Sequence, residues 1–255
     1  MNIICCIPAR YNSTRLEGKP LLKINDKTII HHVYDRVMMV NNESIILNKI
    51  VILTDDIRIK TEVDTFGGEC VIIDKYCLNG TDRICWYLDS TTNNNTIIVN
   101  VQGDEPFIDP NNIKLAINNY INNMNDNMMV CSTIYYETSS FDEIRNPSRG
   151  KLVLDTHNNI MYCSRNIIPV NKKQQIIEGY KYKIHIGVFV FKMDYLMTSY
   201  RNYNTPIQLH EDIEWMKIME QGFHINAVKT NTHEIGVDTL DDYNHLVNKF
   251  TINFT

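Results

Sequence analysis

Residues 3–22 read IICCIPARYNSTRLEGKPLL, and the rest of the chain is organised around this stretch. Its apolar start predicts a buried strand that ends at Pro8. Arg10, Arg15 and Lys19 follow within ten residues, and no neighbouring acidic run neutralises them. Three cations on a loop that leaves the first strand of an α/β chain predict an anion site, and a polyphosphate is the ligand that suits it. The first hypothesis is therefore an enzyme that uses a nucleotide.

Composition narrows the class of protein. The chain has 255 residues, 44% of them hydrophobic and 22% charged, which is typical of one globular domain spanning 1–255. A net charge of -5 argues against a general nucleic-acid binder. The seven cysteines contain no CxxC pair, which favours reduced thiols over a disulfide framework or a zinc site. Without a membrane-length apolar run or a signal peptide, we expect a soluble, cytoplasmic protein that binds no membrane.

Strands and helices alternate along the first part of the chain. Apolar residues at helical spacing occupy 28–40, and a β-branched strand follows at 49–54. A helix to about Phe66 precedes a third strand at 70–74, and 96–101 forms another. This alternation predicts an α/β fold whose mostly parallel sheet is covered by helices on both faces. Ligands of such sheets gather beyond the carboxyl ends of the strands.

The pattern changes after a predicted helix at 110–125 and a strand at 128–135. Two short strands, 151–155 and 159–164, are joined by a turn and predict a hairpin. We interpret residues 137–183 as an arm inserted into the main domain, of a kind that often makes a subunit contact.

The sequence Asn-Gly-Thr-Asp-Arg at 79–83 follows one of the predicted strands. Thr81 is expected to cap the next helix. The functional interpretation places the backbone of Gly80 and Thr81 against a nucleotide, with Arg83 nearby. The alternative is a helix cap with a surface salt bridge.

Two strand ends carry candidate metal ligands. The strand 96–101 leads into Gln102, Gly103 and Asp104, and Mg²⁺ prefers one or two carboxylates with phosphate oxygens. A short strand is predicted at 234–237, and Asp238 then opens the last helix. Each aspartate could instead be a helix cap. If both are ligands, they could share one Mg²⁺ although they are far apart in sequence.

The later chain offers candidates for a second substrate. Arg165 follows a predicted strand and could meet an anion, while His185 lies in an apolar strand, where it is either a core residue or a catalytic one. Periodicity predicts one helix over 208–221, on which Glu214 and Trp215 lie close together. A solvated acidic face is the alternative for that helix.

These pieces, in this order, resemble the 3-deoxy-manno-octulosonate cytidylyltransferase (CMP-Kdo synthetase) family over nearly the whole chain. The blocks IPARYNSTRLEGKPL, VNVQGDEP and GVDTLDDYNHL are the specific ones, and they are joined by NGTDR, NPSRGK, SRNIIP and HIGVFVF. A P-loop kinase is not supported, because the chain contains no GxxxxGK[ST].

The resemblance implies a Rossmann-like nucleotidyltransferase sheet and a homodimer. It implies Mg²⁺-dependent transfer of CMP from CTP to a 2-keto-3-deoxy sugar acid, with release of pyrophosphate, for lipopolysaccharide biosynthesis. It assigns catalysis to Lys19, Asp104 and Arg15, and Mg²⁺ to Asp104 and Asp238. The implied nucleotide-binding residues are Pro8, Ala9, Arg10, Ser13, Arg15, Lys19, Gly80, Thr81, Arg83 and Gln102. The implied sugar-binding residues are Arg165, His185, Phe189, Glu214 and Trp215.

Three positions depart from the family pattern. Glu17 stands where Pro is usual and is expected to point to solvent. Phe189 replaces a Tyr and Trp215 replaces a Gln, both in sugar-facing blocks. CTP activation is therefore better supported than the identity of the acceptor, and 8-amino-Kdo or another nonulosonic acid (sialic or legionaminic type) is the alternative.

Two further functions remain open at this point. One is a different nucleotidyltransferase, making an NDP-hexose or an alcohol cytidylate, against which the His185 and Arg165 blocks argue. The other is a non-catalytic binding protein, which would have no need for Lys19, Asp104 and Asp238 together.

Overall fold

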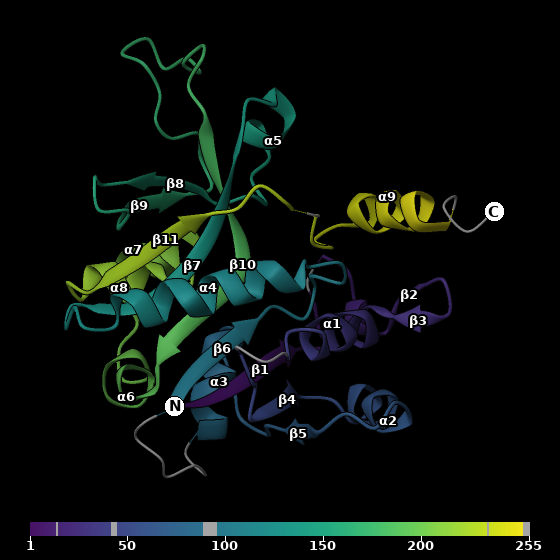
Figure 1. Ribbon diagram of the computed structural model, residues 1–255. Coiled ribbons are helices and arrows are strands. Elements are labelled where there is room, and N and C mark those ends of the chain that lie inside the picture. The colour runs from purple at the N-terminus through teal and green to yellow at the C-terminus, as the bar shows by residue number, and fades with distance from the viewer. Residues whose placement is uncertain (14, 42–44, 89–95, 234, 252–255) are drawn as a thin grey trace. The chain divides into compact units, whose positions relative to one another are not determined.

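The computed structural model describes residues 1–13, 15–41, 45–88, 96–233 and 235–251. The chain divides into two compact units (Figure 1). Unit 1 consists of Met1–Lys114 with Glu234–Thr255, and unit 2 is Leu115–His233. Helix α4 (Pro110–Asn123) spans the boundary in sequence.

Unit 1 contains a parallel sheet in the order β6 (Thr96–Val101), β1 (Asn2–Ala9), β4 (Lys49–Thr54), β5 (Cys70–Ile72). Every residue of β6 is buried, as is every residue of β1 after the first. Because successive side chains point to opposite faces, such continuous burial means that both faces are covered. The predicted parallel α/β sheet is confirmed.

Helices of unit 1 pack on these strands. Helix α1 (Ile29–Met38) contacts β1, α2 (Ile57–Thr65) contacts β4, and α3 (Gly80–Leu88) contacts both. The cationic loop after β1 leads into a short 3₁₀ turn, η1 (Lys19–Leu21), and then into the small hairpin of β2 (Lys23–Ile24) and β3 (Lys27–Thr28).

The last helix, α9 (Leu240–Thr251), is held by an apolar cluster in unit 1. Its Leu246 is buried with Ile24, Ile29, Phe107 and Val237. This packing fixes the backbone that leads into α9.

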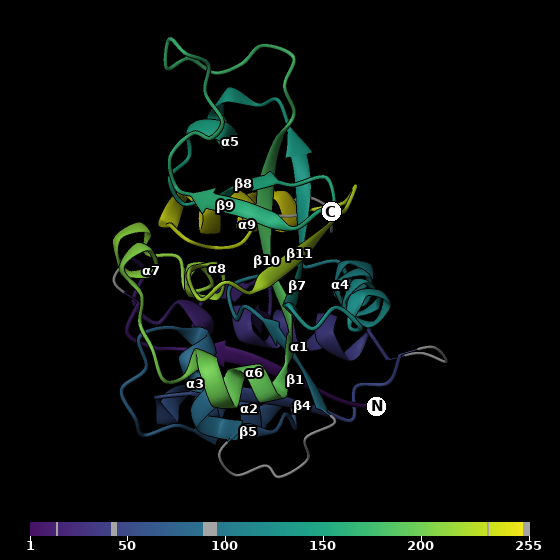
Figure 2. The ribbon, with the colours of Figure 1, turned by 90° about the vertical axis from the view of Figure 1, so that its left-hand side faces the viewer.

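Unit 2 is built on a mixed sheet. Its central strands are β7 (Met129–Thr138) and β10 (Tyr182–Lys192), which are antiparallel, and β11 (His224–Lys229) is parallel to β7. The predicted hairpin is β8 (Lys151–Leu154) and β9 (Ile160–Ser164), which lie side by side next to β10 (Figure 2). Its helices are α5 (Phe141–Arg145), α6 (Met193–Tyr195), the π-helix η2 (Leu196–Tyr200), α7 (Pro206–Glu211) and α8 (Met216–Glu220).

The single helix expected over 208–221 is wrong. Helix α7 ends at Glu211, Asp212 takes a left-handed conformation with φ 52°, and α8 begins at Met216. The backbone carbonyl of Asp212 accepts a hydrogen bond from Arg165 Nη2 at 2.7 Å. A contact with a residue so distant in the chain leaves no mark on local periodicity.

Two candidate caps are also wrong. Asn79, and not Thr81, caps α3, because its Oδ1 accepts the N–H of Asp82 at 2.8 Å. Thr239, and not Asp238, caps α9, because its Oγ1 accepts the N–H of Asp242 at 3.2 Å.

The strand expected at 234–237 is absent over 235–237, and residue 234 lies outside the described residues. The strand in this region is β11, which the sequence interpretation missed.

Candidate active site

Opposite charges converge around Lys19 in unit 1. Its Nζ lies 2.7 Å from Asp104 Oδ2 and 4.0 Å from Asp238 Oδ1, and it donates to the carbonyl of Val237 at 2.7 Å. Arg15 Nη2 lies 2.8 Å from the same Asp238 oxygen. The two predicted metal carboxylates are therefore brought together with two of the predicted phosphate-binding cations.

The end of β6 and the segment before α9 are joined through their backbones. The N–H of Val237 donates to the carbonyl of Asp104 at 2.8 Å. A Cβ on Gly236 would lie 3.0 Å from Glu105 Oε1 and 3.2 Å from the Asp104 carbonyl, so a larger residue would push the two segments apart.

Asp242 fixes the backbone of Asp238. Its Oδ2 accepts the N–H of Asp238 at 3.1 Å and that of Thr239 at 2.8 Å. Together with the Thr239 cap, this is a reciprocal capping arrangement. The sequence interpretation missed Asp242, although the spacing Thr-x-x-Asp at the start of a helix is a signal for it.

The donor set at Asp104 and Asp238 fits a hard divalent cation. Both are carboxylates, and Mg²⁺ is usually held by one or two carboxylates together with phosphate oxygens. Among the described residues, no group of three or more His, Cys, Asp or Glu forms a closed metal site. The pair therefore suits a cation that arrives with a polyphosphate.

Four predicted nucleotide-binding residues meet at the carboxyl ends of β1 and β6. A Cβ on Gly80 would lie 2.9 Å from Pro8 Cγ and 3.6 Å from Gln102 Oε1. A Cβ on Gly103 would lie 2.6 Å from the Pro8 carbonyl and 3.3 Å from Ala9 Cβ. The two glycines allow α3 and the β6 loop to approach the end of β1 this closely.

Arg83 and Thr81 are buried in α3. Arg83 is 4% exposed and its Nη2 lies 2.9 Å from Asp55 Oδ2, so a salt bridge exists, with a buried cation and a carboxylate that reaches the surface. Thr81 Oγ1 accepts from Asn100 Nδ2 at 3.2 Å. These contacts attach α3 to β4 and β6.

The remaining two residues of the predicted phosphate loop differ in their contacts. Arg10 is exposed directly after β1 and forms no ion pair with the residues that the structure describes. Ser13 is partly exposed, and its N–H donates to the carbonyl of Tyr11 at 2.9 Å. Glu17 is exposed, as expected.

The imidazole of His185 has a defined tautomer in unit 2. The hydroxyl of Thr133 donates its one proton to the carbonyl of Val188 at 2.6 Å, so at 2.9 Å it must accept from His185 Nε2. Nδ1 is therefore the unprotonated nitrogen. Val188 lies within the register shift between Ile186 and Phe189, where the pairing of β10 with β7 is irregular. The alternating pattern of the strand's sequence does not indicate this irregularity.

Aromatic rings enclose this imidazole. The ring of Phe189 lies 4.7 Å from that of His185, and Trp215 lies 5.0 Å from it. Phe189 and Trp215 are 2% and 6% exposed. Glu214 is partly exposed next to Trp215, and its carbonyl accepts from Tyr200 at 3.3 Å. The two residues that depart from the family pattern thus shape the surroundings of His185.

Because of His185, the free energy of unfolding of the protein is predicted to fall as the pH falls. Burial lowers the pKa of its imidazole to about 3. Because the folded-state pKa lies below the unfolded value, this contribution is complete above the unfolded pKa and is lost as pH falls from about 6.5 toward 3. We expect wild-type protein to lose about 1–2 kcal/mol more than His185→Gln between pH 7.5 and 5.0, measured by urea unfolding.

The control for that experiment is His245→Gln, since His245 is exposed on α9. Its loss of stability over the same pH range should equal that of the wild type. An equal loss in His185→Gln would contradict the prediction.

Arg165 is engaged in holding α7. Its Nε donates to the carbonyl of Glu211 at 3.1 Å, its Nη2 to that of Asp212 at 2.7 Å, and its Nη1 to that of Pro147 at 3.1 Å. The buried Lys151 donates to the carbonyl of Arg165, and burial lowers the pKa of this lysine to about 8. Arg165 therefore connects the end of β9 to the carboxyl end of a helix, where a cation is favourable.

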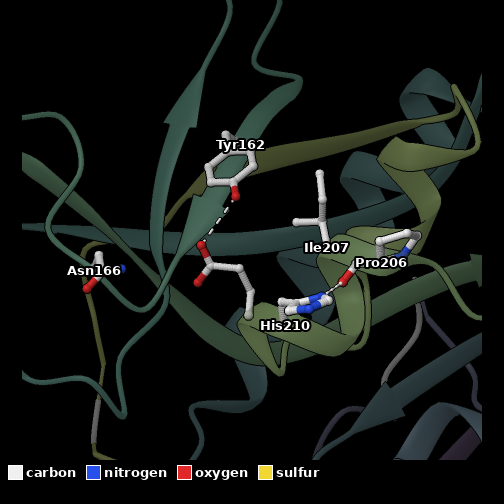
Figure 3. A pocket seen from close by; sticks show the side chains of 6 residues that line it. Tyr162, Asn166, Pro206, Ile207 and His210 are labelled. Carbon is white, nitrogen blue, oxygen red and sulfur yellow. Dashed lines mark hydrogen bonds between the residues drawn. The ribbon is translucent and has the colours of Figure 1, made fainter.

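A hollow of about 350 Å³ lies beside these contacts in unit 2 (Figure 3). The carboxylate of Glu211 accepts from Tyr162 at 3.2 Å and from Ser164 at 2.9 Å, while His210 Nδ1 bonds to the carbonyl of Pro206 at 2.6 Å. The lining residues are Tyr162, Asn166, Pro206, Ile207, His210 and Glu211. The sequence interpretation did not predict this hollow.

Comparison with known proteins identifies the family. The model of the cytidylyltransferase family matches residues 4–230. The chain belongs to the cytidylyltransferase family. The 3-deoxy-manno-octulosonate cytidylyltransferase of Fusobacterium nucleatum is 36% identical over 97% of this chain and 96% of its own. The 8-amino-3,8-dideoxy-manno-octulosonate cytidylyltransferase of Shewanella loihica is 33% identical over 95% of this chain and 96% of its own.

A solved structure supports the same relation. The CMP:2-keto-3-deoxy-manno-octonic acid synthetase complexed with CTP matches this cytidylyltransferase with a TM-score of 0.84 and 28% identity, over 99% of this chain and 100% of that one. The expected resemblance, fold class and enzyme type are therefore confirmed. No described helix of this cytidylyltransferase has the length and apolar character needed to cross a bilayer.

Proposed function

We propose that this cytidylyltransferase transfers CMP from CTP to the anomeric hydroxyl of 3-deoxy-manno-octulosonate (Kdo) or a close relative, with release of pyrophosphate. The observation that carries the proposal is the convergence of Lys19, Arg15, Asp104 and Asp238 at the carboxyl ends of the unit 1 strands. A protein that only bound a nucleotide or a sugar would have no need for this set of charges.

In the proposed reaction the oxygen of the sugar hydroxyl attacks the α-phosphorus in line, its proton passes to water, and the P–O bond to pyrophosphate breaks. Negative charge develops on the phosphoryl oxygens, so positioning and electrostatic stabilisation dominate catalysis. Arg10, Arg15 and Lys19 bind the triphosphate and neutralise the departing pyrophosphate. Ser13 adds a hydroxyl to the same loop. No covalent nucleophile is required.

The nucleoside part is assigned to the residues at the ends of β1 and β6. Pro8, Ala9 and Gln102 lie around the close approach that Gly80 and Gly103 permit. Thr81 and Arg83 hold α3 in place behind it.

We propose Mg²⁺ as the cation, with Asp104 and Asp238 as its protein ligands. When bound it supplies positive charge to the phosphate oxygens of the nucleotide. The two carboxylates would hold the cation, and the Lys19 ammonium lies beside both of them.

We assign the sugar acid to the unit 2 group of Arg165, His185, Phe189, Glu214 and Trp215. With Nε2 donating to Thr133, His185 offers Nδ1 as an acceptor to a donor on the ligand. The buried rings of Phe189 and Trp215 supply no hydroxyl or amide, and a pocket with altered polar groups can select a different substrate. This favours 8-amino-Kdo, or another nonulosonic acid, as the second candidate.

A panel of acceptors tests the function. We expect pyrophosphate release from CTP and Mg²⁺ only when a sugar acid is added, with Kdo or 8-amino-Kdo at least about tenfold better in kcat/KM than a sialic-type acid. Hexose 1-phosphates and alcohol phosphates serve as controls for the other nucleotidyltransferases. Release that depends on a hexose 1-phosphate, or no release with any sugar acid, would contradict the proposal.

We propose a homodimer, which light scattering measures, with the 137–183 arm as the contact. We also propose that residues 1–255 act as one catalytic domain in the cytoplasm, where the product serves lipopolysaccharide synthesis.

A further inference from the structure

Tyr11 lies at the start of the cationic loop and is covered by a cation. The guanidinium carbon of Arg58, from the first turn of α2, lies 3.3 Å from the centroid of the Tyr11 ring. This is well within the range of an attractive cation–π contact. Neither residue carries one of the roles assigned above.

The carboxylate of Asp56 pairs with one edge of the Arg58 guanidinium through both of its oxygens. Arg58 Nε lies 2.9 Å from Asp56 Oδ1, and Nη2 lies 2.7 Å from Oδ2. Asp56 also caps α2 by accepting the N–H of Arg58 at 2.8 Å. A paired fork of this kind fixes the plane of the guanidinium as well as its position.

The backbone of Tyr11 has an anchor of its own. Its N–H donates to Asp55 Oδ1 at 3.2 Å, while the other carboxylate oxygen of Asp55 accepts from Arg83 at 2.9 Å. Two consecutive aspartates at the end of β4 therefore hold Tyr11, one through its backbone and one through Arg58.

The other end of the loop returns to the same ring. The N–H of Gly18 donates to the carbonyl of Tyr11 at 2.9 Å. Gly18 has φ 66°, and a Cβ there would lie 3.2 Å from Tyr11 Cζ. A side chain at this position would be strained by the backbone and crowded by the ring. Lys19 follows directly, so its direction depends on this closure.

We propose that Tyr11 and Arg58 are positioning residues that clamp residues 10–13 and 15–19 in the conformation that receives the triphosphate of CTP. The inference rests on the proposed function, and it concerns residues that need not touch the substrate. The exposed carboxylate of Glu17 adds to the raised pKa of Arg58, after the larger effect of Asp56.

Kinetics of Tyr11→Leu, Arg58→Met and the double variant test the clamp. Each single change should lower kcat/KM for CTP about tenfold while KM for the sugar acid changes less than about twofold. The kcat/KM of the double variant for CTP should be no lower than that of the more impaired single variant, because both changes remove the same contact. Tyr11→Phe keeps the ring and should stay within about twofold of wild type.

The matched control is Lys60→Met, which removes another cation of α2 that pairs with Asp64 at 2.9 Å and lies outside the clamp. Its kinetics should equal those of the wild type. Additive losses in the double variant, or an equal rise in KM for the sugar acid, would overturn the clamp.

Hydrogen exchange separates failure of the clamp from failure of the proposed function. The Gly18 amide bonds to the Tyr11 carbonyl, so its exchange should be at least about fivefold faster in Tyr11→Leu and unchanged in Lys60→Met. Unchanged exchange in Tyr11→Leu would overturn the clamp whatever the reaction. Faster exchange in a protein without CTP-dependent pyrophosphate release would support the clamp and reject the function.

Discussion

Asp104→Asn is expected to reduce kcat for pyrophosphate release by about a thousandfold or more while leaving the protein folded. The carboxylate lies 2.7 Å from Lys19 Nζ and faces Asp238 across that ammonium. Asparagine has the same shape but no charge, so it would bind a divalent cation and balance Lys19 far less well. Steady-state pyrophosphate release with saturating CTP and sugar acid measures the loss.

The fold should survive this change, because the contact that joins residue 104 to the segment before α9 is made by its backbone. The Asp104 carbonyl accepts the N–H of Val237 at 2.8 Å, and asparagine keeps that carbonyl. Circular dichroism and the thermal unfolding midpoint should therefore remain close to those of the wild type.

Asp238→Asn should behave in the same way, since Asp238 is the second carboxylate of the pair. The matched control is Asp64→Asn, which alters an exposed aspartate paired with Lys60 on α2. Near-normal turnover in Asp104→Asn or Asp238→Asn would show that the metal assignment is wrong.

Lys19→Met is expected to lower kcat/KM for CTP by about a hundredfold to a thousandfold. The side chain of Lys19 is only 12% exposed, and its ammonium contacts Asp104, Asp238 and the carbonyl of Val237. Methionine fills a similar volume but supplies no charge to the phosphates or to the two carboxylates. Titration of CTP at fixed sugar acid measures the effect.

A second measurement on Lys19→Met does not depend on turnover. Without the ammonium, Asp104 and Asp238 repel each other and attract a divalent cation more strongly. MgCl₂ alone should therefore raise the thermal unfolding midpoint of this variant more than that of the wild type.

Lys23→Met is the control, because Lys23 is an exposed lysine four residues further along the chain. It should match the wild type in kcat/KM and in its response to MgCl₂. The assignment of Lys19 to the phosphates fails if Lys19→Met retains kcat/KM for CTP within about threefold of the wild type.

The three residues that depart from the family pattern lie in different surroundings. Glu17 is exposed to solvent, so its charge disturbs little. Phe189 and Trp215 are buried against His185, where a hydroxyl or an amide would need partners. The acceptor preference of this enzyme is therefore expected to depend on the surroundings of His185 more than on the phosphate loop.

Most of the unit 1 sheet could be predicted from the sequence. The continuous apolar strands at 49–54 and 96–101 have the bounds of β4 and β6, because a strand buried on both faces needs such a run. Asp104 was also predictable as a site residue, since it follows β6 and ligands gather at strand ends. Asp238 was named through a strand that the structure does not contain over 235–237, so its place beside Asp104 did not follow from a strand end. The sequence therefore determined the fold class and the residue types of the phosphate side.

Only the tertiary structure decided which groups face each other. The carbonyl of Asp212, at the break between α7 and α8, accepts a hydrogen bond from Arg165, and the tautomer of His185 depends on Thr133 and on a register shift in β10. The position of Lys19 depends on Gly18 beside Tyr11 and on the carbonyl of Val237. These contacts join residues that are distant in sequence, whereas periodicity and capping signals report only on neighbours along the chain.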